Sequence, residues 1–208
     1  MSSRFPFSEA PVSGTKELIE QALFAIHGSP PPFQWMEVDG KSMLGSHDAR
    51  DLRSYTPTFV NQFFTLAKTV YDNSVVKPRN RELAILGLTS VLDVPFVVYS
   101  HREVAAKVGL TGQQYEEGRR GKVPSGLSEE EAVAYRLGQI LPALKGPLDD
   151  ATWQEASSKM NKAEIVGVLH TVAGYRWVAM LEQVNGLIGM LGYNVDIPAV
   201  RTNHAVAA

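Results

Sequence analysis

The chain has 208 residues and a mass of 22.8 kDa, with 44% hydrophobic and 20% charged residues, which favours a single domain with short extensions. Its net charge of −2 and pI near 6.2 give no electrostatic reason to expect nucleic acid or an anionic membrane as a partner. The absence of cysteine suits a reducing compartment. Residues 1–7 lack the apolar core of a signal peptide, and no stretch approaches the roughly eighteen apolar residues of a membrane span. These features predict a cytoplasmic protein.

Helical periodicity dominates the first part of the chain. Residues 1–14 are rich in Pro and Ser and predict a flexible arm. Residues 15–27 place apolar side chains on one face and stop at Gly28, as a surface helix does. Residues 34–54 show no clear period, and a segment of that length is expected to pack on the core or line a pocket. A further helix rich in Phe is predicted from residue 57 to residue 71.

Two helices in the middle of the chain carry the titratable residues of greatest interest. Pro78 precedes a helix that contains Glu82. Asp93 as N-cap and Gly109 as the closing residue predict the next helix. One stripe of that helix, at spacings of three and four, consists of Val94, Val97, Val98, His101, Ala105 and Val108. His101 is therefore predicted to face inward.

Capping signals predict the helices of the last part of the chain. Three are expected: one from the Ser128–Glu131 capping box to Leu144, a short one after Asp149 or Asp150, and a long one from Asn161 to about Met190. Strand signals are scarce, with no sustained alternation of apolar and polar residues. The predicted fold class is therefore all-α, a helical bundle with residues 193–208 as a C-terminal tail.

Glu82 and His101 each lie in a run that otherwise has the character of helical core. Between Leu83 and Val98 the only charged residue is Asp93. Burying a carboxylate or an imidazole in such surroundings costs several kcal/mol unless each finds a partner. The two helices therefore predict a mutual Glu–His pair. Such a pair is either a proton-transfer site or a buried structural contact, and the residues alone leave both interpretations open.

A series of segments with a characteristic order and spacing extends over about residues 35 to 190: residues 81–86, 106–110, 126–132, 148–153, 164–166 and 174–180, together with His101. The order and spacing show a resemblance to the carboxymuconolactone decarboxylase and alkyl hydroperoxidase D superfamily. It implies an AhpD-like helical bundle in a single domain, residues 15–192. It also implies that Glu82 and His101 occupy the proton-relay positions of the superfamily. Trimers or hexamers are usual there, so a homo-oligomer is expected, with the apolar helix around Phe59 to Phe64 as a candidate surface.

Departures from the superfamily pattern restrict the chemistry. The two cysteines of the peroxidase branch correspond to Val94 and Val97, and thiol peroxidase activity is excluded because it requires a thiolate. The Tyr-Glu-Trp that often precedes the histidine in the decarboxylase branch corresponds to residues 96–98, which are Phe-Val-Val here. The predicted site thus keeps its acid–base pair and loses its other polar groups, which favours a larger, less polar substrate.

Four further residues are candidates for substrate binding. Val97 lies one turn before His101 on the same helix face and is expected to contact the same cavity. In the last helix His170 lies on a face of small and apolar residues, while Tyr175 and Arg176 are candidates for contact with a substrate carboxylate. The alternative is that Arg176 pairs with a nearby acid and Tyr175 fills the core; for Trp177 the core interpretation is favoured.

Other types of site find no support in the sequence. It contains neither His-Glu-x-x-His nor a Cys/His cluster, so no metal is predicted. Glu82, His101 and His170 would form a metal triad only through an accident of tertiary packing. Glycine-rich nucleotide motifs are absent as well, and no cofactor is expected.

A Glu–His pair in an apolar pocket moves protons to or from carbon next to a group that absorbs charge. The first hypothesis is therefore a cofactor-free, carboxymuconolactone decarboxylase-like lyase that acts on an unsaturated carboxylated small molecule. The second is an isomerase, dehydratase or cyclase of an enolisable metabolite. The third is a non-catalytic small-molecule binding protein of the same fold.

Overall fold

The computed structural model describes residues 4–5, 21–26, 28, 36–38, 41–43, 55–72 and 75–185. The elements in chain order are β1 (Met36–Val38), β2 (Lys41–Met43), the 3₁₀ helix η2 (Pro57–Phe59), α3 (Val60–Asp72), α4 (Pro78–Thr89), α5 (Pro95–Lys107), α6 (Gly112–Arg119), α7 (Glu129–Ile140), the 3₁₀ helix η3 (Leu141–Ala143), α8 (Asp150–Lys159) and α9 (Lys162–Asn185). Residues 21–26 are also helical. The architecture is all-α, as predicted, apart from a small antiparallel hairpin in which Met36 pairs with Met43.

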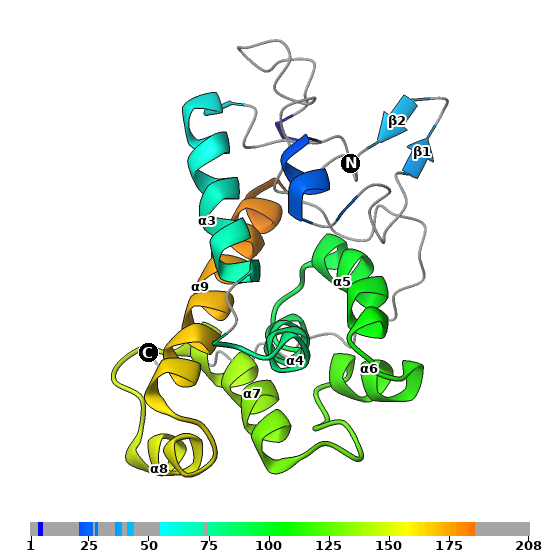
Figure 1. Ribbon diagram of the computed structural model, residues 1–208. Helices are drawn as coiled ribbons and strands as arrows, with labels where there is room; N and C mark the ends of the chain where they lie inside the picture. Colours follow the sequence, from blue (N-terminus) through cyan, green and yellow to red (C-terminus); the bar gives the residue numbers. More distant parts are fainter. Residues whose placement is uncertain are drawn as a thin grey trace, which may run out of the picture.

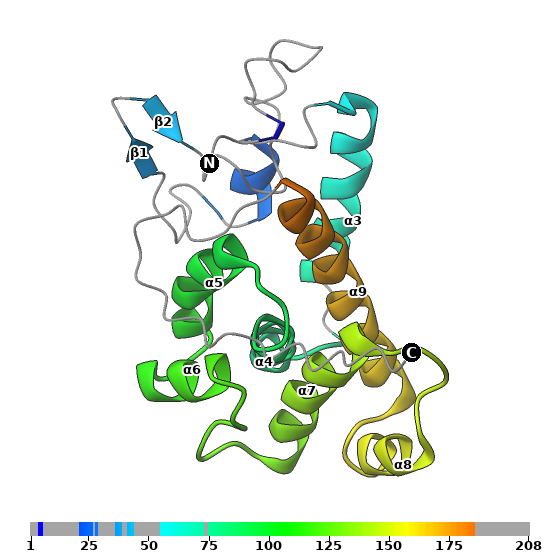
Figure 2. The ribbon, with the colours of Figure 1, turned by 180° about the vertical axis from the view of Figure 1, so that it is seen from behind.

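Helix α4 runs through the middle of the bundle. Figures 1 and 2 show it end-on, surrounded by α5, α6, α7 and α9. Every residue from Asn80 to Thr89 is buried, so the helix has apolar side chains on all sides rather than a single apolar stripe. A helix of this kind is stable only in the core of a larger protein. Glu82 therefore lies in the most enclosed element of the described structure.

Helices α4 and α7 cross at two glycines. A Cβ atom on Gly138 would lie 2.1 Å from the backbone oxygen of Ala84, and one on Gly87 would lie 2.2 Å from the backbone oxygen of Tyr135. Both distances are far below van der Waals contact. The two backbones approach so closely only because neither glycine carries a side chain.

We expect Gly138→Ala to lower the free energy of unfolding by about 3 kcal/mol, the upper end of the range for overpacking, because the obstructing atom belongs to the backbone of α4. Denaturant unfolding followed by circular dichroism measures the change. Gly146→Ala is the matched control: its Cβ would meet nothing within 4 Å, and the substitution should change stability by less than about 0.5 kcal/mol. Equal unfolding midpoints for the two variants would contradict this view of the crossing.

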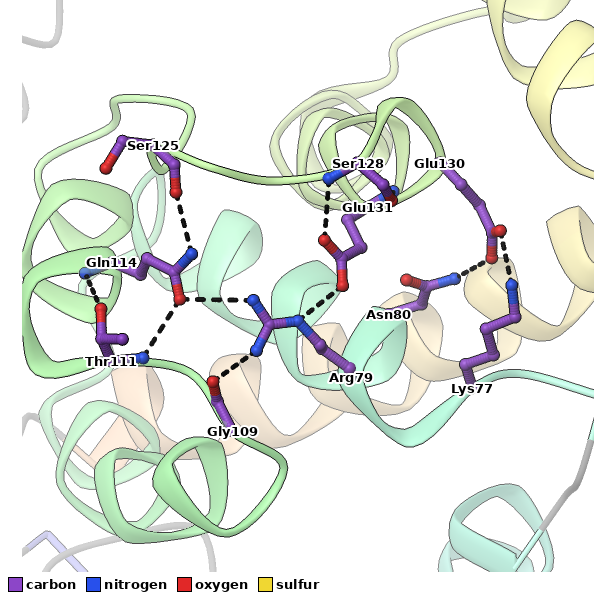
Figure 3. Close-up of polar contacts among 10 residues, drawn as sticks. All are labelled: Lys77, Arg79, Asn80, Gly109, Thr111, Gln114, Ser125, Ser128, Glu130 and Glu131. Carbon is purple, nitrogen blue, oxygen red and sulfur yellow. Dashed lines mark hydrogen bonds and ion pairs between the residues drawn. The ribbon is translucent and has the colours of Figure 1, made fainter.

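A polar network joins the first turn of α4 to its neighbours (Figure 3). The Arg79 guanidinium donates to Glu131 at the start of α7, to the Gly109 carbonyl after α5, and to Gln114 of α6. Beside it, Glu130 accepts from Lys77 and from Asn80. The network joins the start of α4 to the end of α5, to α6 and to the start of α7 with charge-assisted bonds.

The capping motifs predicted for the last part of the chain are confirmed. Ser128 and Glu131 exchange the two bonds of a capping box, Asp149 accepts from Thr152, and Asn161 and Glu164 bond to each other reciprocally. Helix α7 ends at Ile140, however, and continues as η3 to Ala143, short of the predicted Leu144. Pro142 explains the change, since it lacks the N–H that a further α-helical turn requires.

The sequence prediction missed α6 and the hairpin. Helix α6 begins with a capping box of Thr111 and Gln114 and has only eight residues, of which few are apolar. The strands of the hairpin have three residues each, too few to show an alternation. The hairpin falls within the 34–54 segment; the rest of that segment, including its predicted packing on the core, lies outside the described residues.

Helix α5 begins differently from the prediction and ends as predicted. Its N-cap is Val94, without a side-chain cap, and Glu182 of α9 accepts the backbone N–H of Phe96 at 2.8 Å. Asp93 as N-cap was therefore wrong, because a carboxylate distant in sequence takes the role; burial raises the pKa of the Asp93 carboxyl. At the other end Gly109 adopts a φ of +84° and closes the helix.

The predicted domain boundaries are only partly described. Of the predicted arm, residues 1–14, the structure describes Arg4 and Phe5, whose backbone N–H groups donate to the Asn185 side chain. The rest of the arm and the tail at 193–208 lie outside the described residues. Two residues of the predicted arm are thus bonded to the last residue of α9.

Candidate active site

Glu82 and His101 form a buried pair between α4 and α5. The distance from His101 Nδ1 to Glu82 Oε2 is 2.7 Å. His101 is 6% exposed and Glu82 is 1% exposed. Because the carboxylate accepts from Nδ1, we assign the imidazole proton to that nitrogen, and Nε2 is then the acceptor of a neutral ring. The pair has the arrangement of a general base with its orienting carboxylate.

A cavity of about 290 Å³ borders the pair. Its lining includes His101 and Arg81, together with residues of α3, α5, α9 and the helical segment 21–26. Figures 1 and 2 show α3 beside the last turns of α9. Both helices supply residues to the cavity lining. Most of the lining is apolar, and much of it is aromatic. A mainly apolar cavity with a few polar side chains in its wall is the usual form of a small-molecule site.

Tyr175 packs against the His101 imidazole. Its ring meets that of His101 edge-on, with 4.8 Å between the ring centroids. Together with the hydrogen bond to Glu82, this contact restricts the orientation of the imidazole from two sides. Tyr175 also lines the cavity.

The structure brings most of the predicted binding residues together. Val97, His170 and Tyr175 all lie in the cavity wall with His101. Arg176 does not line the cavity in the described part of the chain, although it follows Tyr175 directly. Trp177 was expected in the core; instead it is 38% exposed, lines the cavity and packs edge-on against Phe63.

Sequence reasoning did not single out Arg81. Its side chain is 4% exposed and lines the cavity. The guanidinium lies over the Tyr71 ring at 3.9 Å, Nη1 donates to the Tyr71 carbonyl, and Nε is 3.7 Å from Glu82 Oε1. The only available signal was its position beside Glu82 on a buried helix. Arg81 places a permanent positive charge next to the acid–base pair.

Tyrosine hydroxyls near the pair stay neutral. Burial, and next the negative charge of Glu82, raise the pKa of Tyr71 above its ordinary value. The same two causes raise the pKa of Tyr115, whose hydroxyl donates to the Val98 carbonyl and supports α5. Neither phenol is suited to act as a base at neutral pH.

The described residues contain no group of three or more His, Asp or Glu side chains that could hold a metal ion. Within the same part of the chain, no helix combines the length and the apolar character needed to cross a membrane.

Comparisons of the chain with protein-family models, with curated proteins and with solved structures found no match.

Proposed function

We propose that this protein is a cofactor-free lyase of the carboxymuconolactone decarboxylase type, acting on an unsaturated carboxylated small molecule. One observation carries the proposal: the imidazole of His101 lies in the wall of an apolar cavity and is bonded at Nδ1, over 2.7 Å, to a buried carboxylate. A buried acid–base pair with one partner in a cavity is the arrangement that proton transfer requires.

In the proposed reaction the carbon–carbon bond to the substrate carboxylate breaks and carbon dioxide leaves. The electron pair moves into the conjugated system of the substrate and reaches its carbonyl oxygen. For this step His101 first takes up a proton from solvent at Nε2, and Glu82 stabilises the resulting imidazolium. The imidazolium then delivers that Nε2 proton to carbon and returns to the neutral ring. The apolar wall destabilises the localised charge of the starting carboxylate relative to the spread charge of the transition state.

The purified protein should release carbon dioxide from at least one member of a panel of carboxylated unsaturated lactones and conjugated acids, without added metal or cofactor. Coupled detection of carbon dioxide measures the reaction, with heat-denatured protein as the blank. Exchange of carbon-bound hydrogen with solvent deuterium but no carbon dioxide would favour the isomerase hypothesis. Binding without either reaction would favour the non-catalytic one.

Two further expectations stay predictions: a cytoplasmic location and a homo-oligomer. The apolar helix around Phe59 to Phe64, which was the candidate surface for assembly, is exposed only in part. Phe59 and Leu66 on η2 and α3 are exposed, whereas Phe64 is buried against Val60 and the helical segment 21–26. On α9, exposed apolar side chains recur at Val166, Leu169, Trp177, Met180 and Val184.

A further inference from the structure

Arg81 is the permanent cation of the cavity. Among the described residues that line this space there is no Lys, no second Arg, and no Asp or Glu. His101 and His170 are the other titratable nitrogen bases in the lining. A cation in such an apolar wall is a strong attractor for a ligand's negative oxygen, because little water competes for it.

The guanidinium of Arg81 is held in place and keeps donors for a ligand. The Tyr71 carbonyl accepts from Nη1, and the Tyr71 ring packs on the guanidinium at 3.9 Å. Nε is buried and lies 3.7 Å from Glu82 Oε1, beyond hydrogen-bond range, so a ligand in the cavity does not reach this N–H. The donors that remain for a ligand belong to Nη1 and Nη2. A guanidinium has five N–H donors, so a fixed group with this bonding pattern is pre-organised for an acceptor.

The aliphatic hydroxyl donors of the cavity wall are used locally. Ser100 donates to the Val97 carbonyl and Thr171 to the Gly167 carbonyl, each within its own helix. Arg81 is the permanent positive charge that the described lining offers to a negative oxygen. A carboxylate that is to leave gains nothing from such stabilisation, since the starting state would be lowered and the barrier raised. The oxygen that Arg81 suits is the one at which charge arrives during the reaction.

We propose that Arg81 is the oxyanion-binding residue of this site and donates to the enolate oxygen of a flat conjugated carbonyl compound. The inference rests on the proposed function. When the carbon–carbon bond to the leaving carboxylate breaks, its electron pair forms a new carbon–carbon double bond and the carbonyl π electrons move to the carbonyl oxygen. Arg81 stabilises the negative charge on that oxygen until His101 protonates carbon. Aromatic side chains suited to a flat ligand line the cavity: Phe63, Phe64, Tyr71, Phe96, Tyr175 and Trp177.

4-Nitrophenol tests this without turnover, because its phenolate carries a delocalised oxyanion on a flat ring and absorbs visible light. Titration of the full chain at a pH where both forms of the free probe are present gives the affinity for the phenolate. Equilibrium dialysis gives that for 4-nitroanisole, which has the same ring and no ionisable oxygen. The wild type should bind the phenolate at least about tenfold more tightly than 4-nitroanisole, a difference equivalent to about 1.4 kcal/mol.

Substitutions assign the preference to Arg81. Arg81→Met should abolish it, and Arg81→Lys should keep part of it, since the ammonium retains the charge without the planar fork. Arg102→Met, which removes an exposed arginine of α5 outside the cavity lining, should keep all of it. A preference that persists in Arg81→Met overturns the proposal. If Arg81→Met does not fold, the other proteins decide. The proposal is overturned if Arg81→Lys shows the same preference for the phenolate as the wild type, or if the wild type itself shows no preference.

The binding result is independent of the lyase hypothesis. A wild type that prefers the phenolate but releases carbon dioxide from no substrate leaves the oxyanion site standing and contradicts the lyase. A protein that releases carbon dioxide but shows no preference for the phenolate supports the lyase and removes Arg81 from its mechanism.

Discussion

Glu82→Gln should lower turnover by about 10² or more while the protein stays folded, the usual contribution of one acid–base group. The amide keeps the shape of the side chain and still offers an oxygen to His101 Nδ1, which lies 2.7 Å from the carboxylate in the wild type. It lacks the negative charge that stabilises the imidazolium. His101→Ala should lower turnover at least as much, because it removes the group that contacts the substrate.

Glu182→Gln is the matched control for the loss of a buried carboxylate. Glu182 is 0% exposed and lies outside the cavity lining, where it accepts the Phe96 N–H. Its amide replacement still has an acceptor oxygen, so this variant should keep most of its turnover. If both Glu82→Gln and His101→Ala unfold, the pair is a structural contact; if both are folded and fully active, the catalytic assignment is wrong. Steady-state kinetics and circular dichroism on the same samples separate these cases.

The pairing of Glu82 with His101 could be predicted because local pattern alone placed both side chains in apolar surroundings. Burial without a partner would cost each of them several kcal/mol, and a direct hydrogen bond between the two offsets that cost. The structure has this contact, between helices that are adjacent in sequence and in space. The same logic placed Val97 on the face of α5 that carries His101, and both lie in the cavity wall.

Features that depend on packing between distant segments were not predictable in this way. Arg81 looked like an ordinary helical cation, and only the approach of α3, which supplies Tyr71, shows that its charge is enclosed beside the cavity. The start of α5 was misassigned to Asp93 because the group that satisfies Phe96 is Glu182, 86 residues away. Trp177 packs against Phe63 of α3 and stays partly exposed at the cavity, an arrangement that the periodicity of α9 alone does not reveal.

Val97→Glu should give a folded protein without turnover. Val97 is 2% exposed but lines the cavity, so a longer side chain has space to extend into. Its carboxylate would lie one turn before His101, oppose the charge of an anionic substrate and remove part of the apolar wall. We expect a loss of less than about 2 kcal/mol of stability, which for a chain of this size lowers Tm by less than about 8 °C.

Val104→Glu provides the contrast that makes this result interpretable. Val104 lies two turns further along the same helix and is also 2% exposed, but it does not line the cavity. A carboxylate there has no partner and no space, so it should cost at least about 4 kcal/mol and lower Tm by more than about 10 °C, or cause aggregation. Thermal melts of both variants measure the difference. Equal destabilisation would mean that Val97 is sealed core and that the cavity does not open at His101, which would remove the basis for substrate access to the pair.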